Sequence, residues 1–96
     1  MSNNITRKDL FHGLGNIKKV EQWLKASGKL GLRVCRGSKH PSTIRNPNMP
    51  DDEGNASLIA TIPHNLHRVM NQIIFKEFLR FGIQEDDLWK ALDMIR

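Results

Sequence analysis

Three short runs of strand-forming residues follow one another in the middle of the chain, and they limit the possible folds more than any other feature. They are residues 30–36 (LGLRVCR), 42–45 (STIR) and 57–63 (SLIATIP). In the first run, two leucines and a valine alternate with other residues, which is the two-residue period of a β-strand with one buried face. Turn-forming residues follow the first run, and a long polar loop, residues 46–56, precedes the third. The three runs therefore predict an antiparallel meander.

Helical patterns flank these strands on both sides. Residues 16–28 (NIKKVEQWLKASG) carry apolar residues at i, i+3 and i+7, which lie on one face of a helix. Asn16 is the expected N-cap of this helix, and Gly28 is its expected stop. The segment before it, residues 9–15 (DLFHGLG), predicts a short helical turn, although its two glycines weaken helix formation.

The last third of the chain predicts two more helices. Residues 66–82 (LHRVMNQIIFKEFLRFG) carry an apolar stripe and end at Gly82. The expected stripe consists of Met70, Ile73, Ile74, Phe78 and Phe81. Residues 83–96 (IQEDDLWKALDMIR) predict the final helix, and three acidic residues fill its first turn, where the helix dipole favours anions. Periodicity leaves Trp89 either at the edge of the core or half-exposed.

The order of these elements is helix, three strands, helix and helix, and it predicts a single α+β domain over residues 1–96. The helices are expected to cover one face of a three-stranded antiparallel sheet and to leave the other face open. Residues 1–9 are polar and are expected to form a flexible tail.

The cellular environment is predicted from what the sequence lacks. Cys35 is the single cysteine, so no internal disulfide can form, and no apolar run is long enough to cross a bilayer. The first ten residues lack the apolar core of a secretory signal. These features are typical of the reducing cytoplasm and predict no membrane partner. The sequence also lacks a glycine-rich phosphate loop, a cluster of metal-binding carboxylates and a nucleophile elbow, so we expect no metal and no cofactor.

Charge is spread unevenly along the chain. The net charge is +5, but residues 1–48 hold ten Lys and Arg against two acidic residues, a net of +8. Residues 49–96 hold five Lys and Arg against eight acidic residues, a net of −3. A localised excess of positive charge indicates a polyanionic partner, most simply a nucleic acid, although small proteins are also basic for solubility alone.

Residues 35–47 (CRGSKHPSTIRNP) concentrate this charge around a turn. Arg36, Lys39 and Arg45 are cationic, His40 can titrate, and the segment contains no acidic residue. A histidine can transfer a proton at neutral pH, and neighbouring cations attract a phosphodiester. RNA carries its own nucleophile, the 2′-hydroxyl group, so a base and cations that stabilise the phosphorane could cleave it without a metal ion. On pattern alone, a histidine in a turn is more often structural or merely exposed, and both interpretations stay open here.

Two further histidines, His64 and His67, lie in the segment PHNLH, three positions apart. This spacing allows three interpretations: a metal bridged by the two imidazoles, a helical turn that helps to hold a phosphate, and a plain polar helix start. No cysteine is near, and a third metal ligand would have to come from elsewhere, which favours the second interpretation over the first. The plain helix start requires no ligand at all and is the simplest of the three.

Two longer segments carry a family resemblance. They are residues 23–47 (WLKASGKLGLRVCRGSKHPSTIRNP) and residues 60–92 (ATIPHNLHRVMNQIIFKEFLRFGIQEDDLWKAL). They contain, in order, a helix that ends in glycine, a strand, a Gly-Ser-x-His turn, a strand with a basic residue, a strand that ends in isoleucine and proline, a leucine-containing helix, a glycine and a last helix. Over residues 17–93, the chain resembles the HicA toxins of bacterial toxin–antitoxin systems.

The resemblance implies a fold like that of double-stranded-RNA-binding domains, in the order α-β-β-β-α(-α). It also implies an mRNA interferase, that is, an endoribonuclease acting as the toxin of a type II toxin–antitoxin system. The catalytic histidine of the family falls on His40, the last residue of the turn Gly37–His40. The usual partner of such a toxin is a HicB antitoxin, which masks this histidine and its basic surroundings.

These observations lead to three hypotheses about function. In the first, the chain is a metal-independent ribonuclease with His40 as the general acid and base, and Ser38 positions the turn. The residues expected to contact RNA or phosphate in this hypothesis are Arg36, Ser38, Lys39, Arg45, Arg33, Lys18 and Lys19, with His64 and His67 as possible secondary members. In the second, the chain binds RNA through the same surface without cleaving it. In the third, the open sheet and the helices dock another protein.

Overall fold

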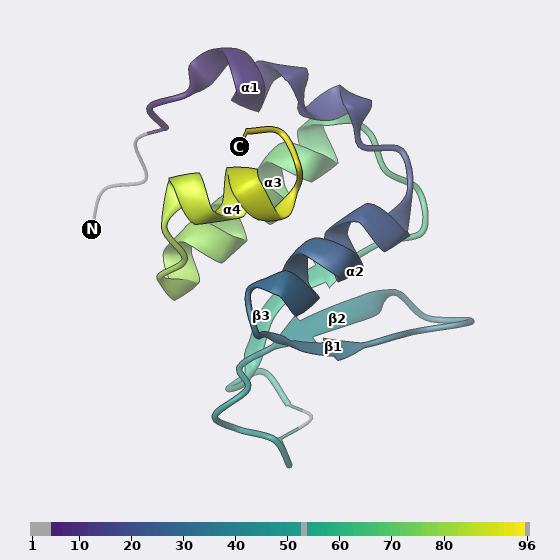
Figure 1. Ribbon diagram of the computed structural model, residues 1–96. Coiled ribbons are helices and arrows are strands. Elements are labelled where there is room, and N and C mark those ends of the chain that lie inside the picture. The colour runs from purple at the N-terminus through teal and green to yellow at the C-terminus, as the bar shows by residue number, and fades with distance from the viewer. Residues whose placement is uncertain (1–4, 53, 96) are drawn as a thin grey trace.

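Three strands and four α-helices form the fold of the computed structural model, which describes residues 5–52 and 54–95 (Figure 1). The elements, in chain order, are α1 (Lys8–His12), the 3₁₀ helix η1 (Gly13–Asn16), α2 (Val20–Lys29), β1 (Arg33–Cys35), β2 (Ser42–Arg45), β3 (Leu58–Ile62), α3 (Arg68–Phe81) and α4 (Glu85–Ala91). The predicted α+β class is confirmed, as is the short helical turn before the first long helix.

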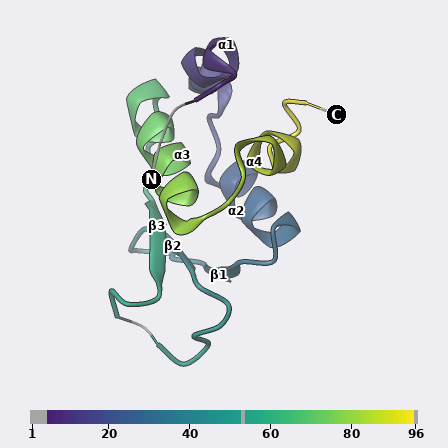
Figure 2. The ribbon, with the colours of Figure 1, turned by 90° about the vertical axis from the view of Figure 1, so that its left-hand side faces the viewer.

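The sheet is the predicted antiparallel meander, with strand order β1-β2-β3. Val34 pairs with Ile44, and Ile44 pairs with Ala60, so the three residues share one face of the sheet. All helices lie on one side of the sheet, and the loop between β2 and β3 lies on the other (Figure 2). Pro41 directly precedes the first residue of β2, as expected for a residue that cannot donate to the ladder.

The first long helix begins and ends later than its sequence pattern predicts. Asn16 does not cap it, because the chain stays extended at Lys19 and α2 begins at Val20. The side-chain oxygen of Gln22 accepts hydrogen bonds from the backbone amides of Lys18 and Lys19, at 3.0 and 3.1 Å, and so satisfies donors before the first turn. At the other end, Gly31 rather than Gly28 takes the left-handed backbone conformation, with φ of 77°.

The extension of α2 shortens the following strand. Residues 30–36 were expected to form a strand, but Leu30 is the C-cap of α2 and β1 contains only residues 33–35. The amide of Leu32 donates to the carbonyl of Ser27, which closes the end of the helix. Because residues 30–32 form the end of the helix, they cannot also pair with a strand of the sheet.

The buried face of α3 is rotated relative to the predicted stripe. Ile74 and Phe78 are buried as expected, but Ile73 is 48% exposed and Phe81 is 41% exposed. Phe75, which the stripe omits, is fully buried because α1 and α4 pack against that side of the helix through Phe11 and Trp89. The predicted stop is confirmed, since Gly82 has a φ of 121°.

The last helix is shorter than residues 83–96, because α4 covers only Glu85–Ala91. After it, Asp93 takes a φ of 60°, and the amide of Met94 returns to the carbonyl of Trp89. Trp89, whose position was left open, is fully buried, and its indole nitrogen donates to the Glu85 carboxylate at 2.8 Å.

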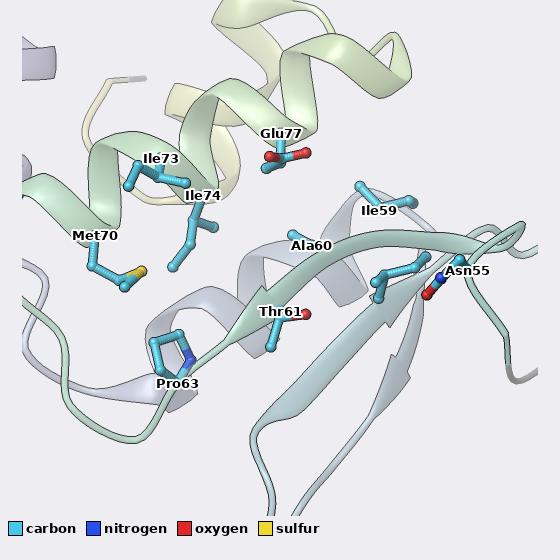
Figure 3. Close-up of a pocket in the computed structure, with 10 residues that line it drawn as sticks. Asn55, Ile59, Ala60, Thr61, Pro63, Met70, Ile73, Ile74 and Glu77 are labelled. Atoms are coloured by element: carbon cyan, nitrogen blue, oxygen red, sulfur yellow. The ribbon is translucent and has the colours of Figure 1, made fainter.

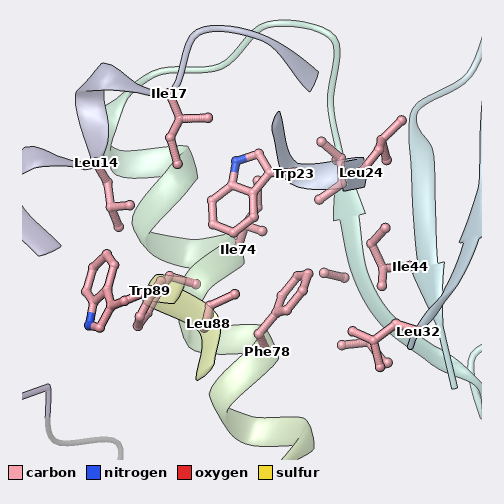
Figure 4. Packing of buried hydrophobic residues seen from close by; sticks show 14 residues of the cluster. Leu14, Ile17, Trp23, Leu24, Leu32, Ile44, Ile74, Phe78, Leu88 and Trp89 are labelled. Carbon is pink, nitrogen blue, oxygen red and sulfur yellow. The ribbon is translucent and has the colours of Figure 1, made fainter. Parts of the chain in front are cut away.

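One buried amide, that of Asn71, joins the helical layer around the cluster of buried apolar side chains that Figure 4 shows. Asn71 on α3 accepts a hydrogen bond from the indole nitrogen of Trp23 at 3.0 Å. Its amide nitrogen donates to the carbonyls of Leu14 and Ile17, at 2.7 and 2.9 Å. Because both Asn71 and Trp23 are fully buried, these bonds spare the core the cost of unpaired polar groups. They also hold Ile17, which lies before α2, in the core.

The N-terminal segment is anchored by α4. The two carboxylate oxygens of Glu85 accept hydrogen bonds from the backbone amides of Thr6 and Arg7, at 2.8 and 2.9 Å. Arg7 also forms a 3.1 Å ion pair with Asp86. Residues 1–9 were expected to be a flexible tail; residues 1–4 lie outside the described residues, whereas residues 6 and 7 are held by α4 and α1 already begins at Lys8.

Candidate nucleic-acid interface

The candidate site is the tight turn of the β1–β2 hairpin, residues 36–41, which projects from one end of the sheet (Figure 1). Inside the turn, the amide of Gly37 donates to the hydroxyl group of Ser42 at 3.0 Å. A Cβ atom at position 37 would lie 2.0 Å from the backbone oxygen of His40 and 2.8 Å from that of Pro41. The turn therefore requires glycine at position 37, because the backbone on its two sides approaches too closely for a side chain.

His40 itself is exposed at this turn, as are Ser38 and Lys39. The imidazole of His64 reaches the same turn, and its Nε2 atom lies 3.1 Å from the backbone oxygen of His40. Since a carbonyl oxygen only accepts, Nε2 carries the proton, and Nδ1 is the acceptor in the neutral ring. The structure thus brings His40 and His64 together, although 24 positions separate them in the chain.

Arg36 connects the turn to the start of α2. Its guanidinium group makes two hydrogen bonds to the carboxylate of Glu21, at 2.7 and 2.8 Å. The hydrogen bond from Arg36 holds the pKa of Glu21 below its ordinary value, and the same bond raises the pKa of Arg36. Arg36 was expected to face phosphate, but in this arrangement Glu21 occupies the planar edge of its guanidinium group and offsets its charge.

Lys18 and Lys19 lie directly before α2. The ion pair between Arg36 and Glu21 connects the turn to this same end of the helix. Both residues are exposed, and their backbone amides are held by Gln22. The start of α2, the β1–β2 turn and the loop before α3 lie on the same side of the molecule in Figure 1. Of the residues expected to bind phosphate, the structure therefore places the exposed Lys18, Lys19, Ser38 and Lys39 at the same end as His40, together with Arg36, which is paired with Glu21.

His67 has a structural task that the sequence left open. It is the N-cap of α3, and its Nδ1 atom accepts a hydrogen bond from the amide of Met70 at 3.3 Å. Of the three interpretations of PHNLH, the structure favours the polar helix start, because His64 and His67 are engaged with different backbone groups. Over residues 5–52 and 54–95, no three His, Cys, Asp or Glu side chains are grouped so that they could hold a metal ion.

Arg33 and Arg45, the other two expected phosphate-binding residues, serve the loop at the far end of the sheet. They are direct partners across β1 and β2. Arg33 donates to the backbone oxygens of Met49, at 3.1 Å, and of Asp52. Arg45, only 9% exposed, donates to the backbone oxygen of Gly54 and to the Ser57 hydroxyl at 2.9 Å. These two arginines were expected to contact RNA; in this structure their guanidinium groups contact the loop.

The same loop carries the acidic run of the sequence. Hydrogen bonds from the side chain and the backbone of Ser57 hold the pKa of Asp52 below its ordinary value. Because β2 runs from Ser42 at the turn to Arg45 at the loop, the acidic loop and His40 lie at opposite ends of the sheet. Asp51 and Asp52 are thus kept away from the candidate site.

One basic residue at this end was not predicted. Arg68, the exposed first residue of α3, lies beside Gly15, and a Cβ atom at position 15 would be 3.4 Å from the Arg68 Cβ. Its place directly after PHNLH, at the start of a helix, is a signal that sequence reasoning could have used. Arg68 adds a cation near the segment that carries His64.

The arrangement offers an exposed imidazole with a neighbouring ammonium group, on a turn fixed by glycine and by a second imidazole. Comparison of the chain with protein-family models, with curated proteins and with solved structures yields no match. Among the described residues, no helix is both long and apolar enough to pass through a bilayer. The function is therefore inferred from the chemistry of this end of the molecule.

Proposed function

We propose that this chain is a metal-independent endoribonuclease that binds RNA at the end of the molecule bearing His40. The observation that carries the proposal is the hydrogen bond from His64 to the His40 carbonyl, because it holds the backbone of the turn on which the exposed His40 follows the exposed Lys39. The resemblance to HicA toxins extends the proposal to mRNA as the substrate, to a toxin role in the bacterial cytoplasm, and to a HicB-type antitoxin as the partner.

In the proposed reaction, the neutral imidazole of His40 accepts the proton of a ribose 2′-hydroxyl group. The 2′-oxygen attacks the adjacent phosphorus, the bond from phosphorus to the 5′-oxygen breaks, and the His40 imidazolium gives its proton to that leaving oxygen. The products are a 2′,3′-cyclic phosphate and a 5′-hydroxyl group. Lys39 stabilises the negative charge that develops on the phosphorane, whereas Lys18 and Lys19 bind flanking phosphates.

The test is RNA cleavage by purified wild type and His40→Asn, with a metal chelator present. We expect the substitution to lower the cleavage rate by about 10²-fold or more, because it removes the general base. His12→Asn is the matched control, since His12 is exposed on α1 and takes no part in the site. Equal cleavage by wild type and His40→Asn, or no cleavage by either, would contradict the proposal.

A second candidate function, RNA binding without cleavage, is favoured by the Arg36–Glu21 ion pair. That pair leaves Lys39 as the cation next to His40 in the turn and so reduces the positive charge available to stabilise a phosphorane. If this function is the true one, wild type and His40→Asn bind RNA equally well, their affinity falls with salt, and neither cleaves it.

A further inference from the structure

An open groove of about 420 Å³ lies between β3 and α3. Residues of β3, among them Ala60, line one side of this groove, Met70 and Ile73 on α3 line the other, and Glu77 lies further along the helix (Figure 3). The groove is lined mostly by apolar side chains. None of the residues proposed to bind or cleave RNA lines it, so the inference below does not rest on the proposed ribonuclease activity.

The strand that borders the groove is an edge strand. The sheet has the order β1-β2-β3, so that β3 pairs with β2 on one side and, within the described part of the chain, with no strand on the other. An edge strand presents backbone N–H and C=O groups that can pair with another extended chain. A partner in extended conformation therefore fits this edge better than a helix does, because it alone can use those groups.

The helix that borders the groove carries exposed apolar side chains. Val69, Ile73 and Phe81 are the large hydrophobic residues that the described structure leaves exposed, and all three belong to α3. Ile73 lines the groove and is still 48% exposed. An extended partner would place alternate side chains in the groove, where they would cover Ile73.

The negative charge of Glu77 indicates which kind of extended segment would bind in the groove. Glu77 is the charged member among the described residues that line the groove, and its contact with Arg80 is a long one of 3.5 Å. We propose that β3 binds an extended segment of another protein, with alternating apolar residues that enter the groove and a lysine or arginine that pairs with Glu77. A second copy of this chain fits less well, because β3 (LIATI) holds no basic residue and each copy carries a net charge of +5.

The test begins with a random peptide library displayed to the purified full-length protein, with peptides of about six residues, the usual length of a strand. We expect the selected peptides to alternate apolar residues and to contain a lysine or arginine. Titration of such a peptide should shift the backbone amide signals of β3 and α3 in NMR spectra and protect the β3 amides from hydrogen exchange.

Three single substitutions on α3 are compared for their effect on peptide binding. Ile73→Asp should weaken peptide binding by about tenfold or more, because a charge would be buried in the groove. Glu77→Lys should weaken it by about fivefold, the worth of an exposed ion pair. Val69→Asp makes the same type of change at an exposed residue of α3 that does not line the groove, and it should leave binding unchanged.

Three outcomes would overturn the proposal. The first is that no peptide is selected above background. The second is that the selected peptides shift the amides of other elements, or that Val69→Asp weakens binding as much as Ile73→Asp does. The third is concentration-dependent dimerisation of the wild type that Ile73→Asp abolishes, because the groove would then hold a second copy of this chain.

Discussion

The shape of the β1–β2 turn depends on Gly37, because the backbone of His40 and Pro41 occupies the space that a side chain would need. Gly37→Ala should force the turn open at a cost of about 1–3 kcal/mol in the free energy of unfolding. It should also lower RNA cleavage, since the His40 carbonyl would move away from His64. Denaturant titration and cleavage assays on the same variant measure the two effects.

Gly13→Ala is the matched control for this substitution, because a Cβ atom at position 13 would meet no other atom within 4 Å. We expect it to change neither stability by more than about 0.5 kcal/mol nor cleavage. A Gly37→Ala protein with full stability and full cleavage would show that the close approach in the turn has no functional importance.

Between elements, Glu85 links α4 to the N-terminal segment and makes the stability of this contact depend on pH. Burial raises the pKa of Glu85, but hydrogen bonds from Thr6, Trp89 and Arg7 together outweigh burial, and the pKa lies below its ordinary value. A lowered pKa in the folded state adds stability above the ordinary pKa of the carboxyl group, and this stability is lost as the pH falls through the lowered value.

Glu85→Gln should therefore destabilise the protein at neutral pH by about 1 kcal/mol, a modest figure because solvent screens a partly exposed carboxylate. The difference from wild type should shrink as the pH falls below the ordinary pKa of a glutamate, about 4.3, and through the lowered pKa of Glu85, because the wild-type carboxyl group then becomes protonated. Thermal unfolding of both proteins across this range measures it. Asp87→Asn, which removes a charge at an exposed position of the same helical turn, should show a smaller difference. If the stability difference between wild type and Glu85→Gln stayed constant across this pH range, the ionisation of Glu85 would not contribute to stability as described.

The elements differ in how well their sequence patterns predict them. The residues of β2 (STIR) and the stop at Gly82 are predicted correctly, because local turn chemistry and the freedom of glycine decide them. The start of α2 is not, because the Gln22 side chain rather than Asn16 satisfies the amides before the first turn. The buried face of α3 is also missed in part, because α1 and α4, packed on one side of the helix, bury Phe75.

In the whole molecule, the basic residues of the first half of the sequence lie at two opposite ends of the sheet. Lys18, Lys19 and Lys39 stay exposed at the end that carries His40, whereas Arg33 and Arg45 hold the acidic loop at the other end. The sequence predicts the turn and its histidine from local pattern and family resemblance. It does not predict this division or the approach of His64, since both depend on contacts between distant segments.

The chemical ends of RNA cut by the wild-type protein test the central claim most directly. If His40 activates the 2′-hydroxyl group of the substrate, the products carry 2′,3′-cyclic phosphate and 5′-hydroxyl ends, and RNA with 2′-O-methyl groups is not cut. Mass spectrometry of the products distinguishes these ends from others. Products with 3′-hydroxyl and 5′-phosphate ends, or cleavage of the methylated RNA, would contradict the account.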